Sequence, residues 1–324
     1  MKRGLFAALV AGAMLAATAA SVPAQTYPAK SVRVIVPYPP GGAADPIIRG
    51  ITQRLAGLWG QPVIVENRPG AGTIIGADFV AKAPGDGYTL LFSDSTTYVI
   101  SPNLYTRLPY DILKDFAPIT IAIRVSPVVI INSAIPVSTF NELVAYIKDR
   151  PGKLTYGSFG NGSWGHVAME QLNRLAGISV VHVPYKGGAS LIPDLISGQI
   201  SILLSIFKTY EPLEKAGKVR FLAAATAIRI PLRPELPTIA ESGIPNYSIN
   251  LWFALAAPIS TPPAILDKIN ADVRKILGEP EYLKYLATQG MEPIGTSRVE
   301  FAETLKSETK HWGQLVRDSG AKVE

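Results

Sequence analysis

The stretch that decides the fold is Arg33-Val-Ile-Val-Pro-Tyr-Pro-Pro-Gly-Gly-Ala-Ala-Asp45-Pro46. A hydrophobic strand, expected over 32–37, runs into a loop of Pro and Gly. We expect Asp45 at the N-cap and Pro46 at the first position of a helix that ends at Leu58, because both residue types favour those positions. The apolar residues of this helix recur at helical spacing, which predicts one face packed on a sheet. The segment therefore predicts one strand–loop–helix unit of an α/β protein.

A second segment repeats this design about 120 residues later, as Lys153-Leu-Thr-Tyr-Gly-Ser-Phe-Gly-Asn-Gly-Ser-Trp-Gly-His166. We expect a strand over 153–157 and a helix over 163–175 with Ser163 as its N-cap. In open α/β sheets, the loops after the carboxyl ends of strands line the ligand crevice. Backbone N–H groups at a helix start are unpaired, and the helix dipole adds positive charge there. The pair of loops predicts one anion held between two domains without Arg or Lys. The alternative is that the glycines of these loops only allow the tight turns between strand and helix and bind no ligand.

The rest of the chain continues the alternation of strands and helices, with short loops and no long linker. This pattern predicts an α/β protein with mostly parallel sheets and with domains joined by crossing strands. The further strands are expected over 63–66, 88–93, 119–131, 180–183, 200–204, 219–225 and 252–257, and the further helices over 73–82, 138–148, 189–197, 262–277, 279–288 and 298–319.

Composition excludes several classes of protein. The 324 residues include no Cys and three widely spaced His, which argues against disulfides, a cysteine nucleophile and a Cys- or His-based metal site. We therefore expect neither a metal nor a cofactor. The net charge is +6, and the Lys and Arg residues are scattered along the sequence, so no nucleic-acid surface is expected.

The N-terminus has the features of a secretory signal peptide. Lys2 and Arg3 precede an uncharged apolar run from Leu5 to Ala20, and Val22-Pro-Ala24 follows with small residues at the −3 and −1 positions. A membrane anchor is the alternative, but the run is shorter than the ~20 residues that a span needs. We expect a signal peptide over 1–24, cleaved near Ala24, and a periplasmic protein of net charge +4.

Two enzyme classes remain as weaker alternatives. Gly160-Asn-Gly-Ser-Trp-Gly165 matches the dinucleotide fingerprint, but the next strand ends in 182–185 without an acidic residue for a ribose. An exported hydrolase could use Ser158, Ser163 and His166, but neither serine lies in a GxSxG elbow. At the start of a helix, His166 is expected to stay neutral and to bind the ligand or cap its own helix. We therefore do not expect an enzyme.

Six longer stretches carry a resemblance to a known family. They are Val36-Pro-Tyr-Pro-Pro-Gly-Gly42 with Asp45, Gly60-Gln-Pro-Val-Ile-Val-Glu-Asn-Arg-Pro-Gly-Ala-Gly72, Ala83-Pro-Gly-Asp-Gly-Tyr-Thr89, Tyr156-Gly-Ser-Phe-Gly-Asn-Gly162 with His166, Val183-Pro-Tyr-Lys-Gly-Gly188 and Leu236-Pro-Thr-Ile-Ala-Glu-Ser-Gly243. On these stretches, the chain resembles the periplasmic solute receptors of the tripartite tricarboxylate transporter family, also called the Bordetella uptake gene family.

The resemblance implies a two-lobed type II periplasmic-binding fold that closes on its ligand. Lobe 1 would comprise 25–126 and 251–324, and lobe 2 would comprise 127–250. The implied ligand is a small carboxylate, either a di- or tricarboxylate or an aromatic carboxylate. The implied partners are the subunits of a membrane transporter, and we expect the receptor to be a monomer.

The resemblance also implies the ligand-binding residues. They are Pro39, Gly41, Gly42, Ala43, Ser93, Ser95, Ser158, Gly160, Gly162, Ser163, His166, Lys186, Gly187 and Ser205. The chain departs from the family pattern at Ser201 and Ser205, which stand where acidic residues are usual. Our hypothesis is that it prefers a carboxylate without an amino group. A second departure is Thr73, where Gly is usual, so the shape of that loop is open.

Overall fold

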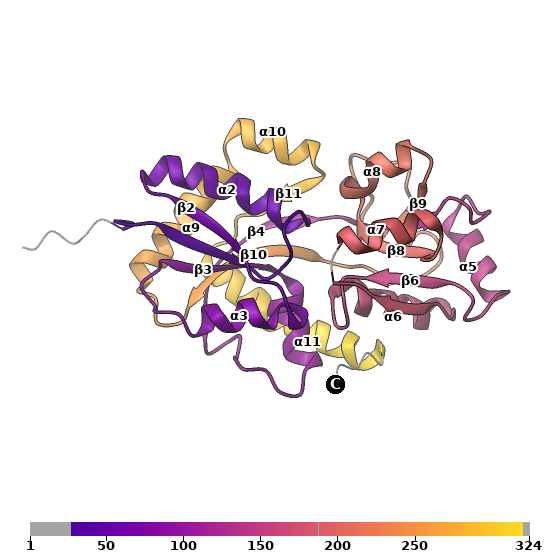
Figure 1. The fold of residues 1–324 in the computed structure, drawn as a ribbon, viewed down its shortest axis with the longest axis horizontal. Helices are drawn as coiled ribbons and strands as arrows, with labels where there is room; N and C mark the ends of the chain where they lie inside the picture. Colours follow the sequence, from indigo (N-terminus) through magenta and orange to yellow (C-terminus); the bar gives the residue numbers. More distant parts are fainter. Residues whose placement is uncertain (1–26, 187, 320–324) are drawn as a thin grey trace, which may run out of the picture.

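Two β-sheets form the centres of two lobes that lie side by side along the long axis of the molecule (Figure 1). The computed structural model describes residues 27–186 and 188–319. The expected signal peptide and Gly187 lie outside the described residues. No helix in the described ranges is long and apolar enough to cross a membrane.

The first sheet has the strand order β11-β4-β10-β3-β1-β2. Helices α2, α9 and α10 lie on one side of it, and α3 and α11 on the other (Figure 1). The strands are β1 (Val32–Val36), β2 (Val63–Asn67), β3 (Thr89–Asp94), β4 (Phe116–Val125), β10 (Leu251–Pro258) and β11 (Met291–Pro293), and the helices are α2 (Ala44–Trp59), α3 (Ile74–Ala81), α4 (Ser101–Leu104), α9 (Pro263–Leu277), α10 (Pro280–Thr288) and α11 (Arg298–Ser319).

The second sheet has the order β7-β6-β8-β5-β9. Helices α7 and α8 lie on one side and α6 on the other (Figure 1). Its elements are β5 (Pro127–Asn132), β6 (Thr155–Ser158), β7 (Val181–Pro184), β8 (Ile202–Ile206), β9 (Val219–Ala224), α5 (Phe140–Lys148), α6 (Trp164–Ala176), α7 (Gly188–Ser197) and α8 (Phe207–Lys215).

The expectation of mostly parallel sheets needs correction. The strand–helix–strand units do pair in parallel, as β1 with β2 and β3, and β6 with β7 and β8. The strands that cross between the lobes, β4, β5 and β10, pair antiparallel with their neighbours. Each sheet is therefore mixed, because a strand that returns from the other lobe arrives in the opposite direction.

The crossing takes place inside one apolar run. The strand expected over 119–131 is two strands, β4 and β5, which belong to different sheets and meet at Ser126. The lobe boundaries at 126 and 250 remain proposals, and both fall between a strand of one sheet and a strand of the other.

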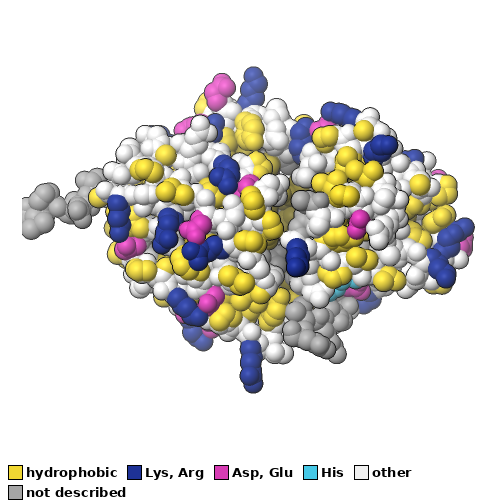
Figure 2. Space-filling model, viewed as in Figure 1, with side chains coloured by type: hydrophobic (Ala, Val, Ile, Leu, Met, Phe, Trp, Pro, Cys, Tyr) yellow, Lys and Arg dark blue, Asp and Glu magenta, His cyan; other side chains and the backbone are white. Residues whose placement is uncertain are grey.

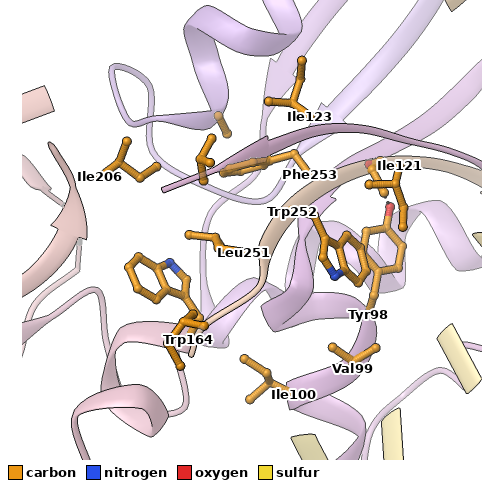
Figure 3. Packing of buried hydrophobic residues seen from close by; sticks show 14 of the residues in the cluster. Tyr98, Val99, Ile100, Ile121, Ile123, Trp164, Ile206, Leu251, Trp252 and Phe253 are labelled. Atoms are coloured by element: carbon orange, nitrogen blue, oxygen red, sulfur yellow. Dashed lines mark hydrogen bonds between the residues drawn. The ribbon is translucent and has the colours of Figure 1, made fainter. Parts of the chain in front are cut away.

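The hydrophobic core is continuous across the junction of the lobes. Tyr98 stacks on Trp252 with ring centroids 5.7 Å apart. Figure 3 shows Trp164, at the start of α6, beside Leu251, at the start of β10. All three side chains of this junction, Trp164, Leu251 and Trp252, are buried. Apolar packing therefore holds the start of α6 against the other lobe.

Candidate functional site

The loop between β1 and α2 differs from the expectation at its helix start. Helix α2 begins at Ala44 with Ala43 as its N-cap, so Asp45 lies inside the first turn. The Asp45 carboxylate reaches back and accepts a hydrogen bond from the Gly41 N–H at 2.9 Å. Its other oxygen accepts from Asn67 Nδ2 at 2.9 Å. Asp45 thus shapes the loop from within the helix, because it satisfies the Gly41 donor instead of capping the end.

The donors that stay free in this loop lie just after Gly41. The N–H groups of Gly42, Ala43 and Ala44 have no hydrogen-bond partner within the described part of the chain. They stand at the N-terminus of a 16-residue helix. Such a position favours the binding of an anion, because the unpaired N–H groups can donate hydrogen bonds and the helix dipole adds positive charge.

A cavity of about 230 Å³ adjoins these donors. The first lobe contributes Gly41, Gly42, Ala43 and Pro46, together with Gln289 and Met291. The second lobe contributes the start of α8, and Figure 2 shows the surface hollowed between the lobes. The cavity is therefore an inter-lobe site, with the α2 N-terminus on one wall.

The second Gly-rich loop, 158–163, satisfies most of its own polar groups. Ser163 is the N-cap residue of α6, as expected, but its side chain does not cap the helix. Its hydroxyl donates instead to the Gly160 carbonyl oxygen at 2.8 Å. The Gly162 N–H donates to Nδ1 of His166 at 3.1 Å. His166 is therefore the residue that closes this loop onto the helix.

His166 belongs to a stack of three rings. The His182 ring lies between those of His166 and Tyr156, with centroid distances of 4.0 and 4.8 Å. Its Nε2 atom lies 2.6 Å from the Ser158 hydroxyl. Burial, and secondarily His166, lower the pKa of His182 to about 4, and burial also lowers the pKa of His166. Both rings are neutral near pH 7, and His182, expected to be structural, helps to shape the loop.

One hydrogen bond joins this loop to the other lobe. The Trp164 N–H, at the first position of α6, donates to Thr96 Oγ1 at 3.3 Å. Thr96 is held in place by Asp94, whose carboxylate accepts from the Thr96 N–H at 2.8 Å. Burial raises the pKa of Asp94. Thr96 opens a π-helical turn over Thr96–Ile100, and such turns are frequent at functional sites.

The polar residues behind the first loop form a buried chain of hydroxyl groups. Ser93 Oγ lies 3.3 Å from the Tyr38 hydroxyl and 2.5 Å from Thr97 Oγ1, and the Thr97 hydroxyl donates to Thr73 at 2.8 Å. Ser95 is fully buried, and its hydroxyl has no partner among the described residues. The end of β3 is thus a polar wall next to the first loop.

The family model of the tripartite tricarboxylate transporter family receptor, TctC, matches residues 47–321. The chain belongs to this family. Protein BugT of Bordetella pertussis is 33% identical over 310 residues, which cover 95% of each chain. A protein from Pseudomonas sp. (strain P51), encoded between tcbD and tcbE, is 34% identical over 95% of this chain and 93% of its own.

Solved structures agree with the TctC assignment. An R. palustris protein determined with adipate has a TM-score of 0.88 and 33% identity, over 92% of this chain and 100% of its own. MatC from Rhodopseudomonas palustris with bound malate has a TM-score of 0.83 and 29% identity, over 90% and 100%. The periplasmic binding protein BugD has a TM-score of 0.85 and 28% identity, over 92% and 100%. The expected family and two-lobed fold are therefore confirmed.

The residues expected to bind the ligand of this TctC receptor lie in three parts of the structure. Gly41, Gly42 and Ala43 line the cavity, and Pro39 lies just before them in the same loop. Ser93 and Ser95 lie in the polar wall at the end of β3, while Ser158, Gly160, Gly162, Ser163 and His166 form the second loop. The second loop does not line the cavity, so the two loops stay a predicted rather than an observed clamp.

Two of the expected residues belong to none of these three groups. Lys186 is exposed between β7 and α7. Ser205 is 3% exposed on β8, close enough to the Tyr210 hydroxyl to oppose the rise in the Tyr210 pKa that burial causes. Their roles as ligand contacts stay predictions, and for Ser205 the interaction with Tyr210 supplies a structural role.

Sequence reasoning missed the start of α8 and the residues Asp94, Thr96 and Lys208. Helix α8 follows β8 without a turn and contains Pro212, so neither a loop signal nor a clean helical pattern marks it. Thr96 follows the expected residue Ser95 in the sequence, but only the fold shows that its hydroxyl meets the other lobe. The described residues also contain no cluster of metal-ligating side chains.

Proposed function

We propose that this TctC-family chain is an exported receptor that captures a small carboxylate between its two lobes and presents it to a tripartite tricarboxylate-type membrane transporter. The observation that carries the proposal is the inter-lobe cavity, whose wall includes Gly42 and Ala43, two residues with unpartnered N–H groups at the start of α2. An amide cradle at a helix N-terminus binds a carboxylate through charge-assisted hydrogen bonds.

The relatives support the same class of ligand. One solved relative holds adipate and another holds malate, and both are carboxylates without an amino group. No acidic side chain is among the residues that line the described cavity, so a ligand ammonium group would find no carboxylate partner in its walls. These observations favour the hypothesis that aspartate-like ligands bind less tightly than succinate-like ones.

The test is calorimetry of the mature protein with adipate, malate, succinate and aspartate, after native mass spectrometry for a carboxylate retained from the host. Ala43→Pro deletes one of the three N–H donors, and the φ of −58° at Ala43 suits proline. We expect about tenfold weaker binding, since hydrogen bonds to charged groups contribute roughly 1.5–3 kcal/mol.

Ala43→Gly is the matched control, because it changes the same residue but keeps the N–H group. If the backbone N–H group binds the ligand, the affinity of the glycine variant should be within about threefold of the wild-type affinity. Equal affinities of the proline and glycine variants would contradict the role of the amide. A wild-type protein that binds no carboxylate of the panel would contradict the proposed function itself.

A further inference from the structure

Lys208 is the one charged side chain that lines the inter-lobe cavity in the described part of the chain. It is the second residue of α8, on the wall that belongs to the second lobe. The free N–H groups of Gly42 and Ala43 belong to the opposite wall. The cavity therefore has a donor group on the wall of each lobe.

We propose that Lys208 is a specificity-determining residue that binds the distal carboxylate of a linear dicarboxylate, whose other carboxylate lies at the α2 N-terminus. The inference rests on the proposed function and deepens it, because it names the ligand class as a dicarboxylate rather than a monocarboxylate. An ammonium group is a strong partner for a carboxylate in a partly desolvated site.

The walls of the cavity suit an aliphatic chain. Besides the two donors, the walls include the apolar residues Ile206, Met291 and Pro46. A ligand with two charged ends and a short methylene chain would match both donors and this apolar lining. A monocarboxylate of equal length would satisfy only one end and would leave Lys208 without a ligand partner.

Lys208 pairs with Glu211, a carboxylate that also has a second lysine partner. Its Nζ atom lies 2.5 Å from Oε2 of Glu211, and its side chain is 30% exposed. The other carboxylate oxygen of Glu211 lies 3.0 Å from Nζ of Lys215. Two lysines share one glutamate, so Glu211 keeps a partner when Lys208 binds a ligand. The same two lysines lower the pKa of Glu211, which keeps it ionised.

Lys215 provides a matched control for the experiment. It pairs with the same Glu211, but its side chain is 72% exposed and it is not part of the cavity wall. Lys208→Met and Lys215→Met therefore each remove one lysine from the same cluster, and only the first removes a cation from the cavity. Thermal unfolding of both variants checks that their stabilities match.

The experiment is calorimetry of the three proteins with adipate and with hexanoate, which share the six-carbon chain but differ by one carboxylate. We expect the wild type and Lys215→Met to prefer adipate by about tenfold or more. Lys208→Met should lose that preference through weaker adipate binding, with hexanoate affinity unchanged, and Lys208→Arg should recover part of it.

The possible outcomes separate this inference from the proposed function. A Lys208→Met protein that keeps the adipate preference, or a wild type that binds hexanoate as tightly as adipate, would overturn the role of Lys208 while leaving a carboxylate receptor. Equal losses in Lys208→Met and Lys215→Met would overturn it too, because the effect would then come from the Glu211 cluster. A wild type that binds no carboxylate would overturn both proposals.

Discussion

Among single residues, His182 shows how one side chain shapes the second Gly-rich loop, 158–163. It is the middle ring of the stack with His166 and Tyr156, and it hydrogen-bonds with Ser158. Tyr156 and His182 are register partners on β6 and β7, so the parallel pairing places the rings side by side. The Tyr156 hydroxyl in turn donates to Glu170 at 2.5 Å.

The stack makes stability depend on pH in a defined window. The pKa of His182 is about 4 in the folded protein, against an ordinary value of 6.5. The unfolded chain therefore binds the proton first, and the stabilisation is complete above pH 6.5 and declines as the pH falls towards 4. His182→Gln stays neutral, so its melting temperature should fall less than that of the wild type between pH 7 and 4.5.

The control for this measurement is His311→Gln, because His311 is exposed on α11 and lies outside the stack. Its melting temperature should follow the wild-type dependence on pH. Parallel curves for His182→Gln and the wild type would show that His182 does not produce the pH dependence.

Thr73 is a second residue whose role only its surroundings explain. Its φ of 86° lies in the left-handed region that favours glycine, which is the usual residue here in the family resemblance drawn above. The Thr73 hydroxyl accepts a hydrogen bond from Thr97 in the buried chain behind the first loop. The loop thus keeps a glycine-like backbone while the threonine side chain joins a polar network.

At the scale of elements, the contact between α3 and the end of β1 sets the start of the first loop. A Cβ atom at Gly76 would lie 2.9 Å from the Arg68 carbonyl oxygen and 3.1 Å from Pro37 Cα. Both are backbone atoms, so the helix could not accept a larger residue without moving. Gly76 therefore allows α3 to approach the strand that leads into the loop.

Substitutions at two helical glycines should have opposite effects. Gly76→Ala should destabilise the protein by about 1–3 kcal/mol because of overpacking, and should weaken carboxylate binding by displacing the first loop. A Cβ atom added at Gly57, in α2, would have no other atom within 4 Å. Gly57→Ala should therefore stabilise the protein by up to about 1 kcal/mol, because alanine favours the helix more than glycine does. Urea unfolding measures both, and a stabilising Gly76→Ala would contradict the close approach.

At the scale of the whole molecule, three kinds of contact hold the lobes together in this arrangement. They are the buried packing of Trp164 near Leu251, the hydrogen bond from the Trp164 N–H to Thr96, and a salt bridge between Arg174 of α6 and Asp318 of α11. The first two are buried, while the Arg174 side chain is 48% exposed. We expect the buried contacts to dominate, because exposed ion pairs contribute little.

Thr96→Val tests this expectation, because it keeps the shape of the side chain but removes the acceptor. The Trp164 N–H would lose its partner, which should reduce the population of the present lobe arrangement and weaken ligand binding by about tenfold. Small-angle scattering and calorimetry measure the two effects. Arg174→Gln is the control and should change neither, and a Thr96→Val protein with wild-type affinity would show that this hydrogen bond does not hold the lobes in place.

Most of the elements could be predicted from local patterns. The ranges expected for α6, α9 and α11 agree with the structure to within one residue at each end, because apolar periodicity and helix-breaking residues act over a few neighbours. Where the predicted elements differ from the structure, the cause is also local. Asp45 resembles an N-cap but lies in the first turn, and α8 contains a proline and follows a strand directly.

The sequence by itself determined the two strand–loop–helix units, the family and the Gly-rich loop that lines the cavity. Those features depend on residues that are close together in the chain. The packing of the whole chain, in contrast, sets which amides stay free, that Thr96 meets Trp164, and that Lys208 and Gly42 line one cavity from different lobes. These pairs are far apart in the chain, and no local pattern encodes them. Whether a buried donor binds its own loop, the other lobe or a ligand depends on which acceptor the packed fold brings within reach.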